Sequence, residues 1–72
     1  MSSDQITGLE TELAYLEAHY AELPAAERQQ RRGTALHAAT TLANTIAEAD
    51  DFDSAAYYRA YDLVLAFDRV GY

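Results

Sequence analysis

Histidines, carboxylates and a serine are the side chains of this 72-residue chain that could do chemistry. Neither His19 nor His37 has a second histidine one helical turn away, and the chain contains no cysteine, so no metal-ligand spacing is present. No two carboxylates flank an evident apolar pocket, and Asp53 or Ser54 is explained as the cap of a helix. The sequence therefore predicts a protein that is not an enzyme, with no catalytic residues, no metal ligands and no cofactor.

Acidic side chains form a second candidate site. The net charge is −7, from twelve acidic and five basic residues, and every basic residue is an arginine. Because phosphate contacts need clustered Lys and Arg, this charge disfavours direct binding of nucleic acid and allows a basic protein partner. The carboxylates that we expect on an exposed acidic surface are Glu10, Glu12, Glu17 and Asp62.

An arginine cluster, Arg28, Arg31 and Arg32, holds three of the five basic residues. It could bind an anion or an acidic partner. The alternative is that it neutralises its own chain, since the neighbouring segment 4–23 is rich in glutamate. The second interpretation is favoured, because exposed charges more often serve solubility and their own chain than recognition.

Residues 54–70 carry more apolar side chains than one side of a helix can hold. Placed on a helix at about 100° per residue, they divide into two lines. The first line predicts the intrachain core: Ala56, Ala60, Leu63, Phe67 and Val70. The second line is rich in tyrosine and predicts a partner-binding face: Tyr57, Tyr58, Tyr61, Val64 and Leu65. Since a surface helix normally has one apolar line, the second marks either an interaction surface or a central helix covered on both sides.

Three helices are predicted to position these side chains. Alternating spacings of three and four predict a first helix over about 4–23, through Ile6, Leu9, Leu13, Leu16, Tyr20 and Leu23. Pro24 suits the first position of a second helix, about 24–49, which we expect to run unbroken through Gly33. A third helix over 54–70 follows an acidic linker and ends at Gly71. The expected fold is all-α: a single helical domain over residues 1–72, a small three-helix bundle that associates as a helical dimer.

The length and the hydropathy of the chain also limit the classes of protein to which it could belong. A chain of 72 residues builds a small core that oligomerisation often supports. The first eight residues lack the features of a secretory signal, and no apolar run approaches the length of a membrane span, so we expect a cytoplasmic protein without membrane contact.

The sequence therefore predicts a small acidic, non-enzymatic protein–protein interaction module, a homodimeric regulator or adaptor. Its partner would be itself or another protein, with no small-molecule substrate. The alternative is an acidic inhibitor of the antitoxin, immunity or phage anti-defence (anti-CRISPR) type, which blocks a basic nucleic-acid-binding partner.

Overall fold

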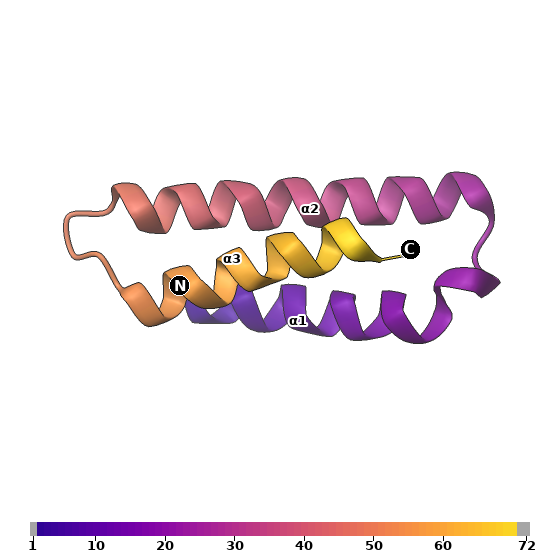
Figure 1. Ribbon diagram of the computed structural model, residues 1–72, viewed down its shortest axis with the longest axis horizontal. Helices are drawn as coiled ribbons and strands as arrows, with labels where there is room; N and C mark the ends of the chain where they lie inside the picture. Colours follow the sequence, from indigo (N-terminus) through magenta and orange to yellow (C-terminus); the bar gives the residue numbers. More distant parts are fainter. Residues whose placement is uncertain (1, 71–72) are drawn as a thin grey trace.

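The computed structural model of the chain describes residues 2–70, and within that range it contains helices and no strand. The elements follow in the order α1 (Ser2–His19), the short 3-10 helix η1 (Tyr20–Glu22), α2 (Ala25–Glu48) and α3 (Ser54–Arg69). α1 and α2 run antiparallel, and α3 lies in front of the pair and returns along α2 (Figure 1). The bundle is an elongated body of 41 × 19 × 16 Å. The predicted all-α bundle of three helices is confirmed.

The connection between α1 and α2 is a tight turn set by a proline. α1 begins at Ser2, slightly before the predicted residue 4, and gives way to the 3-10 turn η1 well before residue 23. Leu23 is extended (φ −82°, ψ 148°), as expected of a residue that precedes proline. Pro24 is the N-cap of α2 and not its first helical residue, and its carbonyl oxygen accepts a 2.9 Å hydrogen bond from the Arg28 amide.

α2 is one continuous helix of 24 residues, and it passes through Gly33 without a break. Its apolar side turns toward the other two helices, where Ala35, Ala39 and Ala43 are buried. Because these side chains are short, they let the neighbouring helices come close to the α2 backbone. A β-carbon added at Gly33 would meet no other atom within 4 Å, so close packing does not require a glycine there.

The loop before α3 is closed by a helix cap. Asp53 is the N-cap residue, and its Oδ1 accepts a hydrogen bond of 3.2 Å from the Ala56 amide. Ser54, the other candidate cap, is instead the first residue of the helix. The ring of Phe52, directly before the cap, lies 5.6 Å from the ring of Tyr57. This arrangement is a hydrophobic staple, which fixes the angle at which the chain enters the helix.

The C-terminal end of α3 is held by a side chain of α2. Arg32 donates from Nε to the Phe67 carbonyl oxygen at 2.9 Å and from Nη2 to the Asp68 carbonyl oxygen at 2.7 Å. Carbonyls of the last helical turn lack partners within the helix, and a cation suits the negative end of the helix dipole. Gly71, which the sequence predicts as the end of α3, lies outside the described residues.

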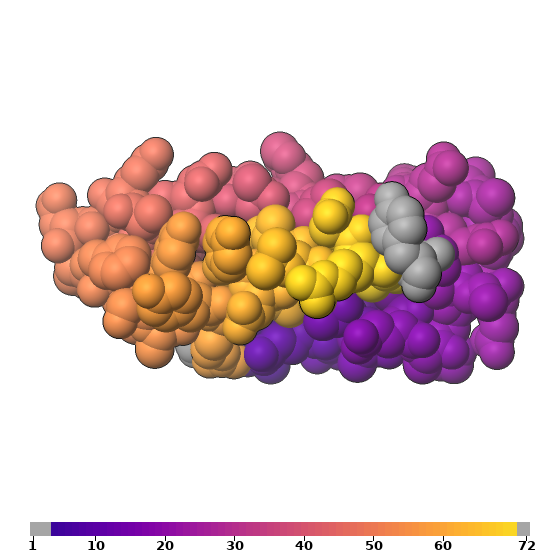
Figure 2. Space-filling model, in the orientation of Figure 1, coloured from indigo at the N-terminus to yellow at the C-terminus, as the bar shows by residue number. Residues whose placement is uncertain are grey.

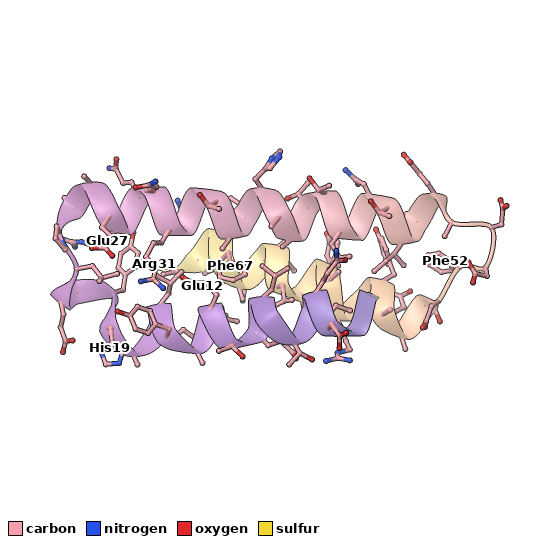
Figure 3. All side chains as sticks on the ribbon, turned by 180° about the vertical axis from the view of Figure 1, so that it is seen from behind. Glu12, His19, Glu27, Arg31, Phe52 and Phe67 are labelled. Atoms are coloured by element: carbon pink, nitrogen blue, oxygen red, sulfur yellow. The ribbon has the colours of Figure 1, made fainter. Side chains whose placement is uncertain are left out.

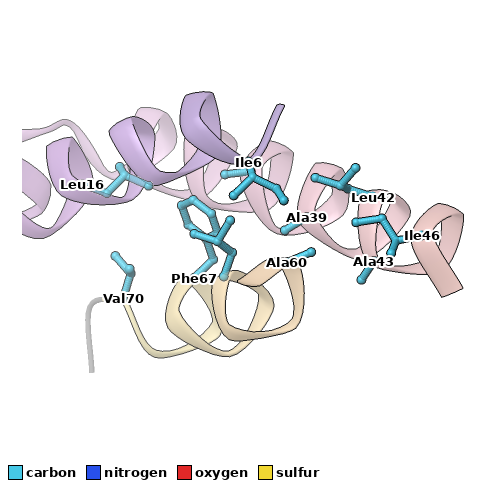
Figure 4. Close-up of a cluster of buried hydrophobic side chains, with 11 residues drawn as sticks. Ile6, Leu16, Ala39, Leu42, Ala43, Ile46, Ala60, Phe67 and Val70 are labelled. Atoms are coloured by element: carbon cyan, nitrogen blue, oxygen red, sulfur yellow. The ribbon is translucent and has the colours of Figure 1, made fainter. Parts of the chain in front are cut away.

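The core runs along the inner sides of all three helices (Figure 4), and every buried residue in the described part of the chain is apolar. The buried set is Ile6, Leu16, Ala35, Ala39, Leu42, Ala43, Ile46, Ala60, Leu63, Phe67 and Val70. The first predicted line of α3 is thus confirmed as core, with only its first residue partly exposed. In α1 the apolar line is buried less evenly, since Leu9 and Leu13 remain partly exposed.

Candidate protein interaction surface

An exposed apolar surface follows the outer side of α3 and the loop before it. We call it the aromatic face, and its residues are Phe52, Tyr57, Tyr58, Tyr61, Val64 and Leu65. The exposed fraction is 50% for Phe52, 64% for Tyr58, 46% for Tyr61 and 37% for Leu65. Figure 2 views α3, in orange and yellow, from this outer side. Among the described residues, the only other large apolar side chain with such exposure is Tyr15, on α1.

The rings of the aromatic face touch one another and form one surface. The ring centre of Tyr57 lies 5.6 Å from that of Phe52, 5.8 Å from Tyr58 and 6.1 Å from Tyr61. These separations are typical of favourable aromatic pairs. Tyr57 and Val64 are partly buried against the core and anchor the face. The described residues leave this face uncovered within one chain, so the alternative of a central helix covered on both sides is wrong.

Phe52 is the residue of this face that the sequence analysis missed. It lies in the linker, outside the predicted helix, and was therefore not placed on either apolar line. The signal that could have found it is the staple pattern, an apolar residue just before the cap and another four residues after the cap. Phe52, Asp53 and Tyr57 fit that pattern.

The carboxylates predicted to form an acidic surface are gathered only in part, since Glu10 and Asp62 line one depression between α1 and α3 whereas Glu12 pairs with α2. That set is Glu10, Glu12, Glu17 and Asp62. Oε1 of Glu10 lies 2.9 Å from Nη2 of Arg59 on α3, and Glu12 pairs with Arg31 on α2. Glu17 and Asp62 are exposed on different helices. Two of the four carboxylates therefore join helices of the same chain.

The pair between Glu12 and Arg31 is bidentate and links α1 to α2 (Figure 3). Nε and Nη2 of Arg31 donate to the two carboxylate oxygens at 2.9 and 3.0 Å, and its guanidinium lies 4.2 Å from the Tyr15 ring centre. The hydrogen bond to Glu12 raises the pKa of Arg31 above its ordinary value, against the opposing effect of burial. Because folding raises the pKa of Arg31, its protonated guanidinium contributes its full stabilisation at pH values below the ordinary pKa of arginine. This stabilisation is lost only at higher pH, so Arg31 stays charged throughout the neutral range.

The other two arginines of the cluster also contact their own chain. Arg32 holds the end of α3, and the guanidinium of Arg28 lies 5.7 Å from the centre of the Tyr20 ring. An arginine over an aromatic face at this distance is a cation–π contact. The intrachain interpretation of the cluster therefore agrees with the contacts that these three arginines make.

The two histidines lie apart, on different helices. Nδ1 of His19 lies 3.0 Å from Oε2 of Glu22, and its ring centre lies 4.9 Å from that of Tyr15, at the exposed end of α1. His37 is exposed on α2. Across the part of the chain that the structure describes, no three His, Asp or Glu side chains come together in a way that could hold a metal ion.

Two open depressions lie between α1 and α2. One, of about 900 Å³, reaches from Pro24 to Ala38, and the next, of about 540 Å³, continues from Ala38 to Thr45. They share Leu9 and Ala38, so they form one groove. Small and aliphatic side chains make up much of the lining. A ligand pocket usually encloses most of a small molecule, whereas this groove is open to solvent.

No known protein family, curated protein or solved structure matches this chain. None of the helices within residues 2–70 combines the length and the apolar character that crossing a lipid bilayer requires.

Proposed function

We propose that this chain is a non-enzymatic protein interaction module that binds through the aromatic face, with a second copy of itself as partner, as in a homodimeric regulator or adaptor. One observation carries the proposal: of five exposed large apolar side chains in the described residues, four belong to the aromatic face. Contiguous apolar patches mark interaction surfaces. Tyrosine suits such a surface because its ring is buried while its hydroxyl stays at the wet rim.

Size favours a second copy as the partner and also limits the affinity. A domain of 72 residues has a small core, and pairing two aromatic faces enlarges the apolar interior. α3 has 16 residues, which span about 24 Å. Two such faces cover less than the roughly 800 Å² per partner that is typical of stable complexes. We therefore expect a weak dimer.

Sedimentation equilibrium over a range of concentrations tests the proposal. Wild-type protein is compared with the double variant Tyr58→Ala/Tyr61→Ala, which removes the two most exposed tyrosines of the face. A loss of about 1 kcal/mol for each tyrosine in each copy amounts to roughly a thousandfold weaker association. The matched control is Tyr15→Ala, because Tyr15 is a comparably exposed tyrosine on another helix.

The double variant is expected to be monomeric and the Tyr15→Ala control to associate like the wild type. Circular dichroism of each variant confirms that the helices are still formed. Wild-type protein that stays monomeric at the highest concentration refutes the proposal. So does a double variant that associates as strongly as the wild type.

The alternative of an acidic inhibitor draws less support from the charges. Glu10 and Glu12 already bind Arg59 and Arg31, so part of the expected acidic surface is neutralised within the chain. That alternative requires binding to a basic protein that weakens strongly as salt is added. Binding that is insensitive to ionic strength would count against it.

A further inference from the structure

Charge is distributed unevenly along the long axis of the bundle. The end at the left of Figure 1, with the last turn of α2 and the loop between α2 and α3, has no basic side chain among the described residues and four acidic ones: Glu48, Asp50, Asp51 and Asp53. We call this the acidic end. The opposite end, with the start of α2 and the end of α3, has four of the five arginines: Arg28, Arg31, Arg32 and Arg69. We call this the arginine end.

The positions of these ends follow from contacts between the helices. Gln5 of α1 and Thr45 of α2 line the same depression, so the first turns of α1 lie beside the last turns of α2. The hydrogen bonds from Arg32 to the last turn of α3 place the start of α2 beside the end of α3. The arginine end also carries five carboxylates, so its net charge is −1, against −4 at the acidic end.

We propose that two copies pair antiparallel through the aromatic face, with the two-fold axis at Tyr61, so that each acidic end lies beside the arginine end of the other copy. The inference rests on the proposed self-association and specifies its geometry. Parallel pairing would place two acidic ends side by side, and juxtaposed like charges cost free energy. Antiparallel pairing separates the two acidic ends along the dimer and places each one beside the less negative end of the other copy.

The order of residues within the aromatic face favours the same arrangement. Tyr61 lies midway between Tyr57 and Leu65 in the sequence. With the axis at Tyr61, the tyrosines in the first half of one face meet the aliphatic half of the other, Tyr57 opposite Leu65 and Tyr58 opposite Val64. Large side chains then pack against smaller ones, which is how close-packed interiors are filled. Parallel pairing would instead set each tyrosine against its own copy.

Distances between labels on α2 distinguish the two geometries. The chain has no cysteine, so single labels can be attached at Gln29→Cys, near the arginine end, and at Glu48→Cys, near the acidic end. Both positions are exposed, and the 19 residues between them correspond to about 29 Å along the helix. Because Arg32 lies level with Phe67, the level of Tyr61 falls about midway between the two labels.

Antiparallel pairing therefore brings a label at Gln29 to the same level as a label at Glu48 of the other copy. Two labels at Gln29, or two at Glu48, are then separated by about 27–30 Å along the axis. Parallel pairing would instead bring like labels to the same level and separate a label at Gln29 from a label at Glu48 along the axis. Pulsed electron paramagnetic resonance measures the intermolecular distance in samples of each labelled variant and in a mixture of the two, with chemically different labels in the mixture.

We expect the mixed pair to give a shorter distance than either like pair. Like pairs that are closer than the mixed pair overturn the antiparallel geometry and leave the proposed function standing. Sedimentation of the labelled variants as monomers at the concentrations used overturns the proposed function and this inference with it. The two failures are therefore distinguishable in one set of samples.

Discussion

Replacement of Gly33 by alanine tests whether α2 is a continuous helix. Gly33 lies in the interior of α2, and a β-carbon added there would meet no atom within 4 Å. Alanine in a helix interior is favoured over glycine by about 0.8–1.0 kcal/mol, because it loses less backbone freedom on folding. We expect Gly33→Ala to raise the free energy of unfolding by about this amount. For a domain of this size the melting temperature then rises by roughly 4–8 °C.

Urea denaturation followed by circular dichroism measures this free energy. All variants are compared at one protein concentration, because association would add to the apparent stability. The matched control is Ala38→Gly, the reverse change at an exposed position of the same helix. It is expected to lower the free energy of unfolding by about 1 kcal/mol.

The sign of the change at Gly33 decides the outcome. If the helix ended at Gly33 with the glycine in a left-handed conformation, alanine would be strained and the variant would be less stable by about 1 kcal/mol. A less stable Gly33→Ala together with a normal loss in Ala38→Gly therefore refutes the continuous helix. No change in either variant would refute the use of helix propensity at these positions.

Three further changes test the other contacts. Phe67→Ala removes a fully buried ring and should lower the free energy of unfolding by about 3–5 kcal/mol, whereas Tyr58→Ala on the aromatic face should change monomer stability by less than about 0.5 kcal/mol, both measured in urea. Asp53→Ala removes the cap of α3 and should cost about 1 kcal/mol, while Asp53→Asn should cost less, because asparagine also caps helices. Arg32→Met removes both hydrogen bonds to the end of α3 and should cost about 1–3 kcal/mol, with the largest increase in amide exchange in the last turn of α3.

The sequence was sufficient for features that depend on local spacing. The period of small and aliphatic residues predicted a continuous α2, and the first apolar line of α3 predicted that Leu63 and Phe67 face the core. The expectation for Pro24 was wrong by one position, because the backbone of Pro24 is itself extended at ψ 148° and the helix begins at Ala25. Spacing alone determines on which side of a helix a residue lies, and these predictions needed only that.

Features that depend on how the helices align with one another could not be predicted from the spacing of residues along the sequence. Glu10 and Glu12 were grouped as one acidic surface, but their partners Arg59 and Arg31 lie on different helices, far away in the sequence. Only the relative level of the helices decides which carboxylate meets which arginine. Leu9 packs against the core and also lines the open groove between α1 and α2, where it stays partly exposed.

The contacts that hold the two ends of α3 affect the order in which the helices of the bundle unfold. α2 and α3 share more contacts with each other than either shares with α1. Their hairpin is also secured at its loop by the Phe52 staple and at its far end by Arg32. α1 is tied to this hairpin by the ion pairs of Glu12 with Arg31 and Glu10 with Arg59, which contribute little where they are exposed, and it contains Gly8 in its second turn. We expect native-state hydrogen exchange to show that α1 detaches as a unit while the hairpin of α2 and α3 stays folded. The detachment briefly exposes the surface that α1 covers, and α1 of another chain could bind there by domain swapping.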